Sequence, residues 1–181
     1  MDNLVGVVSF PSQRPEDMAG IGTPPCLNIG RGTSGWRVTC VQRISRGDAV
    51  LPICGRPTSG PDRYSIQLRE GLHLTPDGAP WALVNHSCDA NLAIDFSRWQ
   101  LVAHRDIVVD EEVTWNYLTT EWELQSPFHC QCGASSCVQH LRGFRHLTAR
   151  QRHALACLLS PFLRSQIGIG VPREEHSQCP E

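Results

Sequence analysis

A short cysteine-rich loop constrains this 181-residue chain more than any other feature of its sequence. Cys130, Cys132 and Cys137 are separated by one and four residues, and Gly133 between them permits a tight turn. Three thiolates at these spacings can converge on one Zn²⁺ ion, which prefers four ligands in a tetrahedral arrangement. The loop therefore predicts a structural zinc site that needs one further ligand, and His129 and His140 are the local candidates.

The nine cysteines of the chain are interpreted together with its N-terminus. This stretch has no charged segment followed by a long apolar one, and no apolar run approaches the ~20 residues that span a bilayer. We therefore expect an intracellular, cytoplasmic protein with no membrane partner, whose cysteines bind metal or are buried as thiols. Unligated core thiols are the alternative for the loop, although its glycine and serines make it polar for a core.

The composition is that of a single globular domain. Hydrophobic residues make up 40% of the chain, charged residues 19%, and the net charge is −2. This balance argues against a disordered chain and offers no basic surface, so we expect no direct nucleic-acid partner. All basic residues are arginines. Two explanations fit this composition. A GC-rich genome favours arginine codons, and an enzyme that modifies lysine benefits from containing no lysine itself.

Local patterns predict a mostly β fold with one short terminal helix. Alternating apolar residues between turn residues predict strands at Leu4–Val8, Trp36–Ile44, Ala49–Ile53, Tyr64–Leu68, Leu72–Leu74, Leu92–Phe96, Gln100–Ala103 and Val113–Tyr117. Residues 1–34 are expected to be an irregular lead-in apart from the first of these strands, and Gly55–Asp62 a loop. Thr148 and Gln151 predict a capped helix that ends near Pro161.

Three motifs in a fixed order give the chain a resemblance to a known family. Asn85-His86-Ser87-Cys88 comes first, Asp110-Glu111-Glu112-Val113-Thr114-Trp115-Asn116-Tyr117 follows, and the cysteine loop comes last. The arrangement resembles a SET domain followed by a post-SET zinc segment, the scaffold of lysine methyltransferases that use S-adenosylmethionine. The resemblance covers about residues 35–163. It implies small β-sheets with a knot-like crossing, and Cys88 as the fourth zinc ligand.

The resemblance also implies a division of the chain. Residues 35–125 are expected to form the SET domain and residues 126–145 the post-SET zinc segment. A C-terminal helix would occupy residues 146–165, and a mobile tail residues 166–181.

The resemblance implies that Gly35, Trp36, Asn85 and His86 bind S-adenosylmethionine. The family usually has a Gly-Trp-Gly turn at Gly35-Trp36, and here its second glycine is replaced by Arg37. Its guanidinium could bind the cofactor carboxylate, or it could occupy the pocket. Asn85 and His86 could equally be polar residues that stabilise their loop.

The resemblance implies that Tyr117 and Trp115 form the catalytic end of the site. Tyr117 matches the tyrosine whose hydroxyl lies where cofactor and lysine meet, although a packed sheet tyrosine is the alternative. Trp115 stands where phenylalanine or tyrosine is usual and would shape the space around the amine. Asn116 replaces the usual aspartate, and Gln139 replaces a glycine two residues after the last zinc cysteine.

The expected function is an S-adenosylmethionine-dependent N-methyltransferase acting on lysine in a protein or peptide. Glu111, Glu112, Glu121 and Glu123 could attract basic acceptors, or they could be solvated surface residues. One alternative is a SET-like scaffold turned to a small-molecule or cofactor-independent reaction, which the unusual residues in the channel would explain. Another is a zinc-bearing interaction module without activity.

Overall fold

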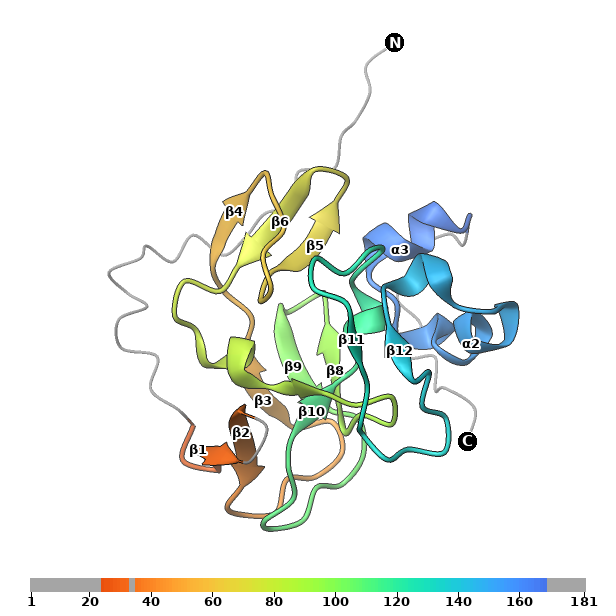
Figure 1. Cartoon of the computed structure of the whole chain (residues 1–181). Helices are drawn as coiled ribbons and strands as arrows, with labels where there is room; N and C mark the ends of the chain where they lie inside the picture. Colours follow the sequence, from red (N-terminus) through yellow and green to blue (C-terminus); the bar gives the residue numbers. More distant parts are fainter. Residues whose placement is uncertain (1–23, 33–34, 169–181) are drawn as a thin grey trace.

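The computed structural model describes residues 24–32 and 35–168, and these are mostly β-structure (Figure 1). Within them lie four small sheets and two short α-helices, α2 (Ala149–Ala154) and α3 (Pro161–Gln166). The largest sheet has five strands and lies in the middle of the molecule, and α2 and α3 lie beside it, to its right in Figure 1. The prediction of a mostly β fold with short helical segments is confirmed.

The five-stranded sheet has the order β3-β9-β8-β10-β7. Its strands are β3 (Ala49–Pro52), β7 (Asn85–His86), β8 (Leu92–Asp95), β9 (Gln100–Ala103) and β10 (Thr114–Trp115). The pairs β3–β9 and β8–β9 are antiparallel, whereas β10 runs parallel to both β7 and β8. Strand β10 therefore brings two segments that are distant in sequence, the Asn85–His86 strand and the segment before Tyr117, into one register.

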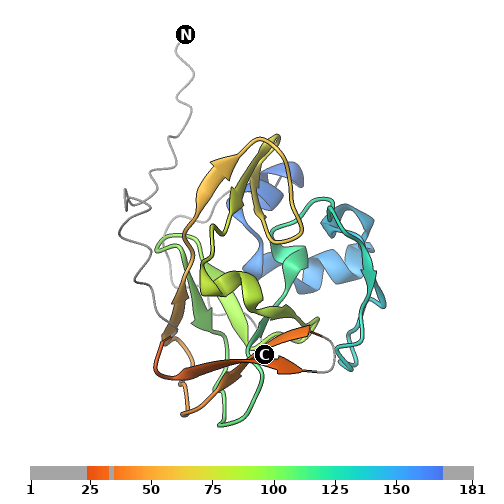
Figure 2. The ribbon, with the colours of Figure 1, turned by 60° about the vertical axis from the view of Figure 1, so that its left-hand side comes forward.

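Three smaller sheets surround the central one (Figures 1 and 2). They are the hairpin of β1 (Leu27–Gly32) and β2 (Gly35–Cys40), the sheet of β4 (Arg56–Thr58), β6 (Leu72–Thr75) and β5 (Ile66–Arg69), and the pair β11 (Phe128–His129) and β12 (His140–Leu141). All pairings within them are antiparallel.

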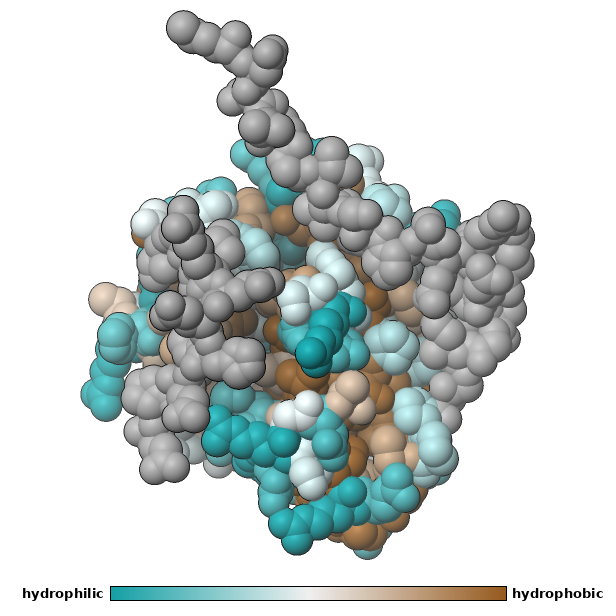
Figure 3. All heavy atoms as spheres, turned by 180° about the vertical axis from the view of Figure 1, so that it is seen from behind, coloured by the Kyte–Doolittle hydropathy of each residue, from teal (hydrophilic) through white to brown (hydrophobic). Residues whose placement is uncertain are grey.

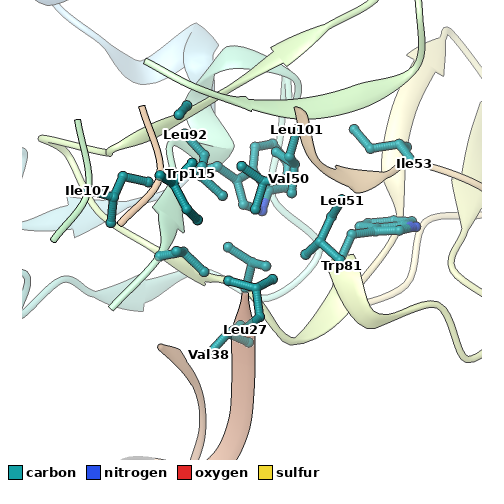
Figure 4. Close-up of a cluster of buried hydrophobic side chains, with 14 of the residues drawn as sticks. Leu27, Val38, Val50, Leu51, Ile53, Trp81, Leu92, Leu101, Ile107 and Trp115 are labelled. Carbon is teal, nitrogen blue, oxygen red and sulfur yellow. The ribbon is translucent and has the colours of Figure 1, made fainter. Parts of the chain in front are cut away.

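Two clusters of buried apolar side chains hold these layers together. The larger lies around the central sheet and contains Leu51, Leu101 and Trp81, each 1% exposed (Figure 4). The smaller is formed by Leu118, Leu141, Phe144, Leu147, Leu159 and Leu163 under the C-terminal helices. Each fully buried side chain of this kind contributes about 1.5–3 kcal/mol. Tyr117 packs against both clusters, so it lies where the two halves of the molecule meet.

Two predicted irregular segments are strands instead. Leu27–Gly32 lies in the predicted lead-in of residues 1–34, yet it pairs along its whole length with β2. Arg56–Thr58 lies in the predicted loop, yet it forms the edge of its sheet. Glycine and proline are tolerated at edges where the partner strand is supplied by tertiary contact, and local sequence does not reveal that partner. The predicted strand at Leu4–Val8 and most of the predicted tail lie outside the described residues.

The predicted terminal helix is divided in two. The capping box of Thr148 and Gln151 is confirmed, but α2 ends after Ala154 and a 3₁₀ turn follows at Ala156–Leu158. Pro161 was predicted to stop the helix, and it instead begins α3, with Ser160 accepting a hydrogen bond from the Leu163 N–H. Proline is favoured at the first helical position because its missing N–H has no partner there in any helix. The strand predicted at Val113–Tyr117 is also shorter, since Tyr117 begins a 3₁₀ turn.

The surface opposite to the view of Figure 1 mixes polar and apolar residues (Figure 3). Among the described residues, no helix has both the length and the apolar character needed to cross a bilayer.

Candidate functional site

Four cysteines from two separate segments lie close together. The Sγ atoms of Cys88, Cys130, Cys132 and Cys137 all lie within 4.8 Å of one another. Around a tetrahedral Zn²⁺ with Zn–S bonds of about 2.3 Å, sulfur atoms are separated by about 3.8 Å. The cluster therefore fits a four-sulfur metal site, and Cys88 supplies the fourth thiol that the loop lacks.

The two local histidines do not belong to this cluster. His129 and His140 face each other across β11 and β12, with ring centroids 4.6 Å apart and nearly parallel planes. Both are exposed, and neither joins the four sulfur atoms.

The pKa values of the cluster cysteines favour the binding of a cation. Burial raises the pKa of Cys130 to about 11 and raises the pKa of Cys88 still more strongly. Cys132 behaves differently. Burial acts to raise its pKa, but hydrogen bonds from the backbone of Cys88 and Ala134 and from neighbouring thiols have the larger effect and lower the pKa to about 6. Several thiolates can therefore be accommodated together only when a metal ion compensates their charge.

His86 connects the cysteine cluster to Tyr117. Its Nδ1 accepts a hydrogen bond from the Tyr117 backbone N–H at 3.2 Å, and its Nε2 lies 3.3 Å from the Cys88 Sγ. Burial lowers the pKa of His86 to about 3, so the ring is neutral and its single proton lies on Nε2, facing the sulfur. The imidazole therefore contacts both Cys88 of the metal cluster and Tyr117 of the second sequence motif.

The Tyr117 side chain is fixed at the centre of the site. Its hydroxyl donates a hydrogen bond to the Val84 carbonyl oxygen at 2.9 Å. The ring centroid of Tyr117 lies 4.8 Å from that of Trp115 and 5.2 Å from that of His86. Burial raises the pKa of Tyr117, so the hydroxyl stays protonated at neutral pH. Trp115 itself is only 6% exposed and belongs to the larger core cluster.

The Gly35–Trp36 end of β2 lies next to Asn85 of β7. The Asn85 side-chain amide donates to the Trp36 carbonyl oxygen at 2.7 Å and to the Glu112 Oε1 at 2.8 Å. Gly35 has φ of 124°, a conformation that L residues rarely adopt. Asn85 thus joins three segments that are far apart in sequence.

Arg37 lies in β2, outside the left-handed region that would require glycine. Its side chain is 51% exposed, and its Nε donates to the Glu112 Oε2 at 2.9 Å. It is absent from the lining of the neighbouring cleft, so replacing the usual glycine does not fill the pocket.

A cleft of about 860 Å³ runs through these motifs. One part is lined by Gly35, Trp36, Asn85 and His86, and Tyr117 and Trp115 line it as well. Every predicted site residue outside the metal cluster except Arg37 therefore borders one continuous space.

Several residues of this cleft were not predicted as site residues. Val84 contributes only a backbone oxygen, which no side-chain motif reveals. Phe128, 38% exposed, faces His86 with centroids 6.2 Å apart. Glu112 links Arg37 to Asn85. The sequence had offered it only as one of four acidic residues near an acceptor.

A family model and two relatives each match part of the chain. Residues 35–118 match the SET domain family. Methyltransferase flvH of Aspergillus flavus is 36% identical over 87 residues, which are 47% of this chain and 48% of that protein. The histone-lysine N-methyltransferase, H3 lysine-36 specific, of Mycosarcoma maydis is 34% identical over 86 residues, or 43% of this chain and 8% of that protein. The chain thus spans about half or less of the length of these relatives.

Solved structures agree on the fold. KRYPTONITE in complex with mCHG DNA and SAH superimposes with a TM-score of 0.54 at 23% identity, over 63% of this chain and 28% of that one. KRYPTONITE with mCHH DNA, H3(1–15) peptide and SAH gives 0.52 at 24% identity, over 64% and 29%. The fold and the cysteine cluster define a SET domain with a C-terminal cysteine segment. The chain therefore contains a SET domain, matched over residues 35–118.

Proposed function

We propose that this chain is an S-adenosylmethionine-dependent N-methyltransferase that acts on lysine in a protein or peptide. The observation that carries the proposal is the single cleft, which joins the Gly35–Trp36 and Asn85–His86 segments to Tyr117. Relatives named methyltransferase and histone-lysine N-methyltransferase support the same reaction.

The residues present fit the cofactor. Gly35 and Trp36 border the cleft with backbone that can approach a ligand closely, and Asn85 and His86 lie across from them. Arg37 stays outside, held by Glu112. When bound, S-adenosylmethionine supplies an electrophilic methyl group. Because Arg37 lies outside the cleft and Trp115 forms part of its lining, the geometry does not favour a scaffold that has lost this cofactor.

Tyr117 is proposed to orient the acceptor amine. Since its hydroxyl proton is committed to the Val84 carbonyl, the lone pairs of its oxygen remain available on the cleft side. Transfer in line requires the nitrogen to be held within about 3–3.5 Å of the methyl carbon, which a fixed phenol beside a rigid core can do. Trp115 is proposed to limit the space for the amine, and with it the number of methyl groups added.

Cys88, Cys130, Cys132 and Cys137 are proposed to hold one structural Zn²⁺. A site closed by four thiolates leaves no position for catalytic water, so this metal would order the wall of the cleft. Residues 35–125 are proposed as the SET domain proper and 126–145 as a post-SET segment that closes over it. Cys130 and Cys132 line the cleft, which supports this arrangement.

The test combines binding and transfer. Calorimetry with S-adenosylhomocysteine should show one site, and tritiated S-adenosylmethionine should label core histones. The chain offers a convenient background, because it contains no lysine that could be labelled in the enzyme itself. Lack of cofactor binding by the zinc-loaded protein would contradict the proposal.

Arg37→Gly serves as the matched control for the cofactor end. Since Arg37 lies outside the cleft, its replacement should change cofactor affinity by less than about threefold, the scale of a surface ion pair. Asn85→Ala removes the two hydrogen bonds that join the segments and should weaken binding by about tenfold or more.

A further inference from the structure

Glu111, Glu112, Glu121 and Glu123, the four glutamates that the sequence suggested for attracting a basic acceptor, differ sharply in their partners. Three of them form ion pairs with the chain's own arginines: Glu111–Arg105, Glu112–Arg37 and Glu123–Arg145. Glu121 has no cationic partner among the residues that the structure describes. It is also the most buried of the four, at 6% exposed.

Glu121 lies one turn beyond Tyr117, and both residues line the cleft. Its backbone N–H donates to the Tyr117 carbonyl oxygen at 3.1 Å, and the residue lines the cleft together with Tyr117 and Phe128. Its Oε1 accepts a hydrogen bond from the Gln67 N–H at 2.9 Å. One carboxylate oxygen is thereby anchored to β5, which fixes the orientation of the carboxyl group.

Such a group is costly to bury without compensation. Burial raises the pKa of Glu121 to about 7, although hydrogen bonds from Gln67 and Thr120 oppose the shift. An unpaired carboxyl in a buried site destabilises the fold unless a cation or a proton satisfies it. A carboxyl with no structural counter-charge beside a cleft is therefore suited to a cationic ligand.

We propose that Glu121 receives the cationic amine of the acceptor and takes its proton. This inference rests on the proposed function for the identity of the acceptor as an alkylammonium group. In the step, one N–H bond of the ammonium breaks and an O–H bond forms on the Glu121 carboxylate. The amine keeps the electron pair and becomes neutral, and Glu121 later releases the proton to water.

The direction of proton transfer follows from burial. Desolvation raises the pKa of a carboxyl and lowers the pKa of an ammonium, so the two values approach each other within the cleft. A neutral amine paired with a neutral carboxyl is then competitive with the ion pair. General bases of this kind contribute about 10²–10⁴-fold to reaction rates.

Binding of a small amine tests the inference without any methyl transfer. We would titrate n-butylammonium chloride, which reproduces the lysine side chain, and neutral N-butylacetamide into the zinc-loaded protein by NMR. The wild type should bind the ammonium about tenfold or more tightly, because a charge-assisted hydrogen bond is available only to it. Glu121→Gln keeps an oxygen acceptor for Gln67 but should reduce the preference to within about twofold.

Glu123→Gln is the matched control, since Glu123 lies two residues away and is paired with Arg145 at the surface. It should keep the preference for the ammonium. With core histones as substrate, Glu121→Gln should lower kcat/KM by about 10²-fold, and Glu123→Gln should leave it within about twofold.

The two proposals fail in different ways. A preference that is lost in Glu121→Gln, without methyl transfer by the wild type, supports the inference and contradicts the proposed function. Methyl transfer by the wild type with no ammonium preference, or equal transfer by Glu121→Gln, overturns the inference alone. An unfolded Glu121→Gln protein is recognised by its Tm, and Glu121→Asp then tests whether a shorter carboxylate restores the preference.

Discussion

The cysteine cluster and the cleft are adjacent, but they are assembled in different ways. Three of the four cluster cysteines lie within eight residues of one another, and only Cys88 comes from a distant segment. The cleft draws its lining from several separate segments, including the start of β2, strand β7 and the 3₁₀ turn at Tyr117. The cluster is thus mainly a local structure, whereas the cleft exists only when distant segments are packed together.

His86 makes the two regions depend on each other. It contacts the Cys88 sulfur on one side and the Tyr117 backbone on the other. A metal ion that fixes Cys88 therefore also fixes the group that positions Tyr117. Metal binding at the cluster can therefore stabilise the position of Tyr117 in the cleft through the His86 side chain.

Loss of the metal should have the largest effect. Cys137→Ser should reduce bound zinc from about one ion per chain to almost none and lower the free energy of unfolding by about 5 kcal/mol or more. The smaller core cluster packs against Cys88 and Cys130, so it should loosen as well. Zinc content by atomic absorption and urea unfolding measure both effects. Cys157→Ser, at an exposed cysteine outside the cluster, should change neither.

Removal of the Tyr117 hydroxyl should affect the cleft and spare the cluster. Tyr117→Phe should lower kcat by about 10²–10³-fold, because the oxygen that orients the amine is lost. Loss of the hydrogen bond to Val84 should cost only about 1 kcal/mol of stability. Methylation assays and thermal unfolding separate these effects. Unchanged kcat in Tyr117→Phe would show that the phenol is a packing residue.

Glu121, which lines the cleft, should make the free energy of unfolding depend on pH. The folded-state pKa of Glu121 is raised to about 7 from an ordinary value of 4.5, so its protonated form favours the fold. Stability from this group is complete below the ordinary pKa and is lost as pH rises through about 7. The full loss is about 3 kcal/mol. Urea unfolding of wild type and Glu121→Gln between pH 5 and 8 should show the wild type losing stability relative to the variant.

A constant difference between the two proteins across this range would contradict the predicted titration. Comparing them at each pH removes the effect of acid on the metal site, which both proteins contain.

The smallest expected effect lies in the cysteine loop itself. Gln139 has φ of 66°, in the region that favours glycine. Gln139→Gly should therefore stabilise the protein by about 1 kcal/mol. Gln131→Gly is the control in the same loop, at an exposed glutamine without positive φ, and should destabilise by about 0.5–1 kcal/mol. Equal effects of the two changes would show that backbone strain at Gln139 is negligible.

The parts of the fold that could be predicted are those determined by local pattern. The strand Gln100–Ala103 and the capping box at Thr148 were located correctly because alternation and capping act over a few residues. The strand Leu27–Gly32 was not predicted because its order depends on pairing with β2. The helix near Pro161 was misjudged because proline both ends and begins helices, and only the packing of Leu163 decides between these roles.

The site shows the same division. The three loop cysteines could be recognised from residue type and spacing, whereas the motif around Tyr117 was recognised through the resemblance to the SET family. The partner of Arg37 was not, and its pairing with Glu112 spans 75 positions. Glu121 could not be told apart from Glu123 by sequence, although one is buried and the other is exposed and paired.

The sequence by itself determined the mostly β fold, the cysteine loop and the order of the motifs, because these follow from short-range spacing and from residue chemistry. The tertiary structure brought Cys88, which the resemblance had implied, beside the loop cysteines. It alone decided that Arg37 leaves the cleft open and that Glu121 has no counter-ion among the described residues. Each of these depends on which distant segments pack together. Packing sets burial and pairing, and burial and pairing determine whether a charged side chain supports the fold or serves a ligand.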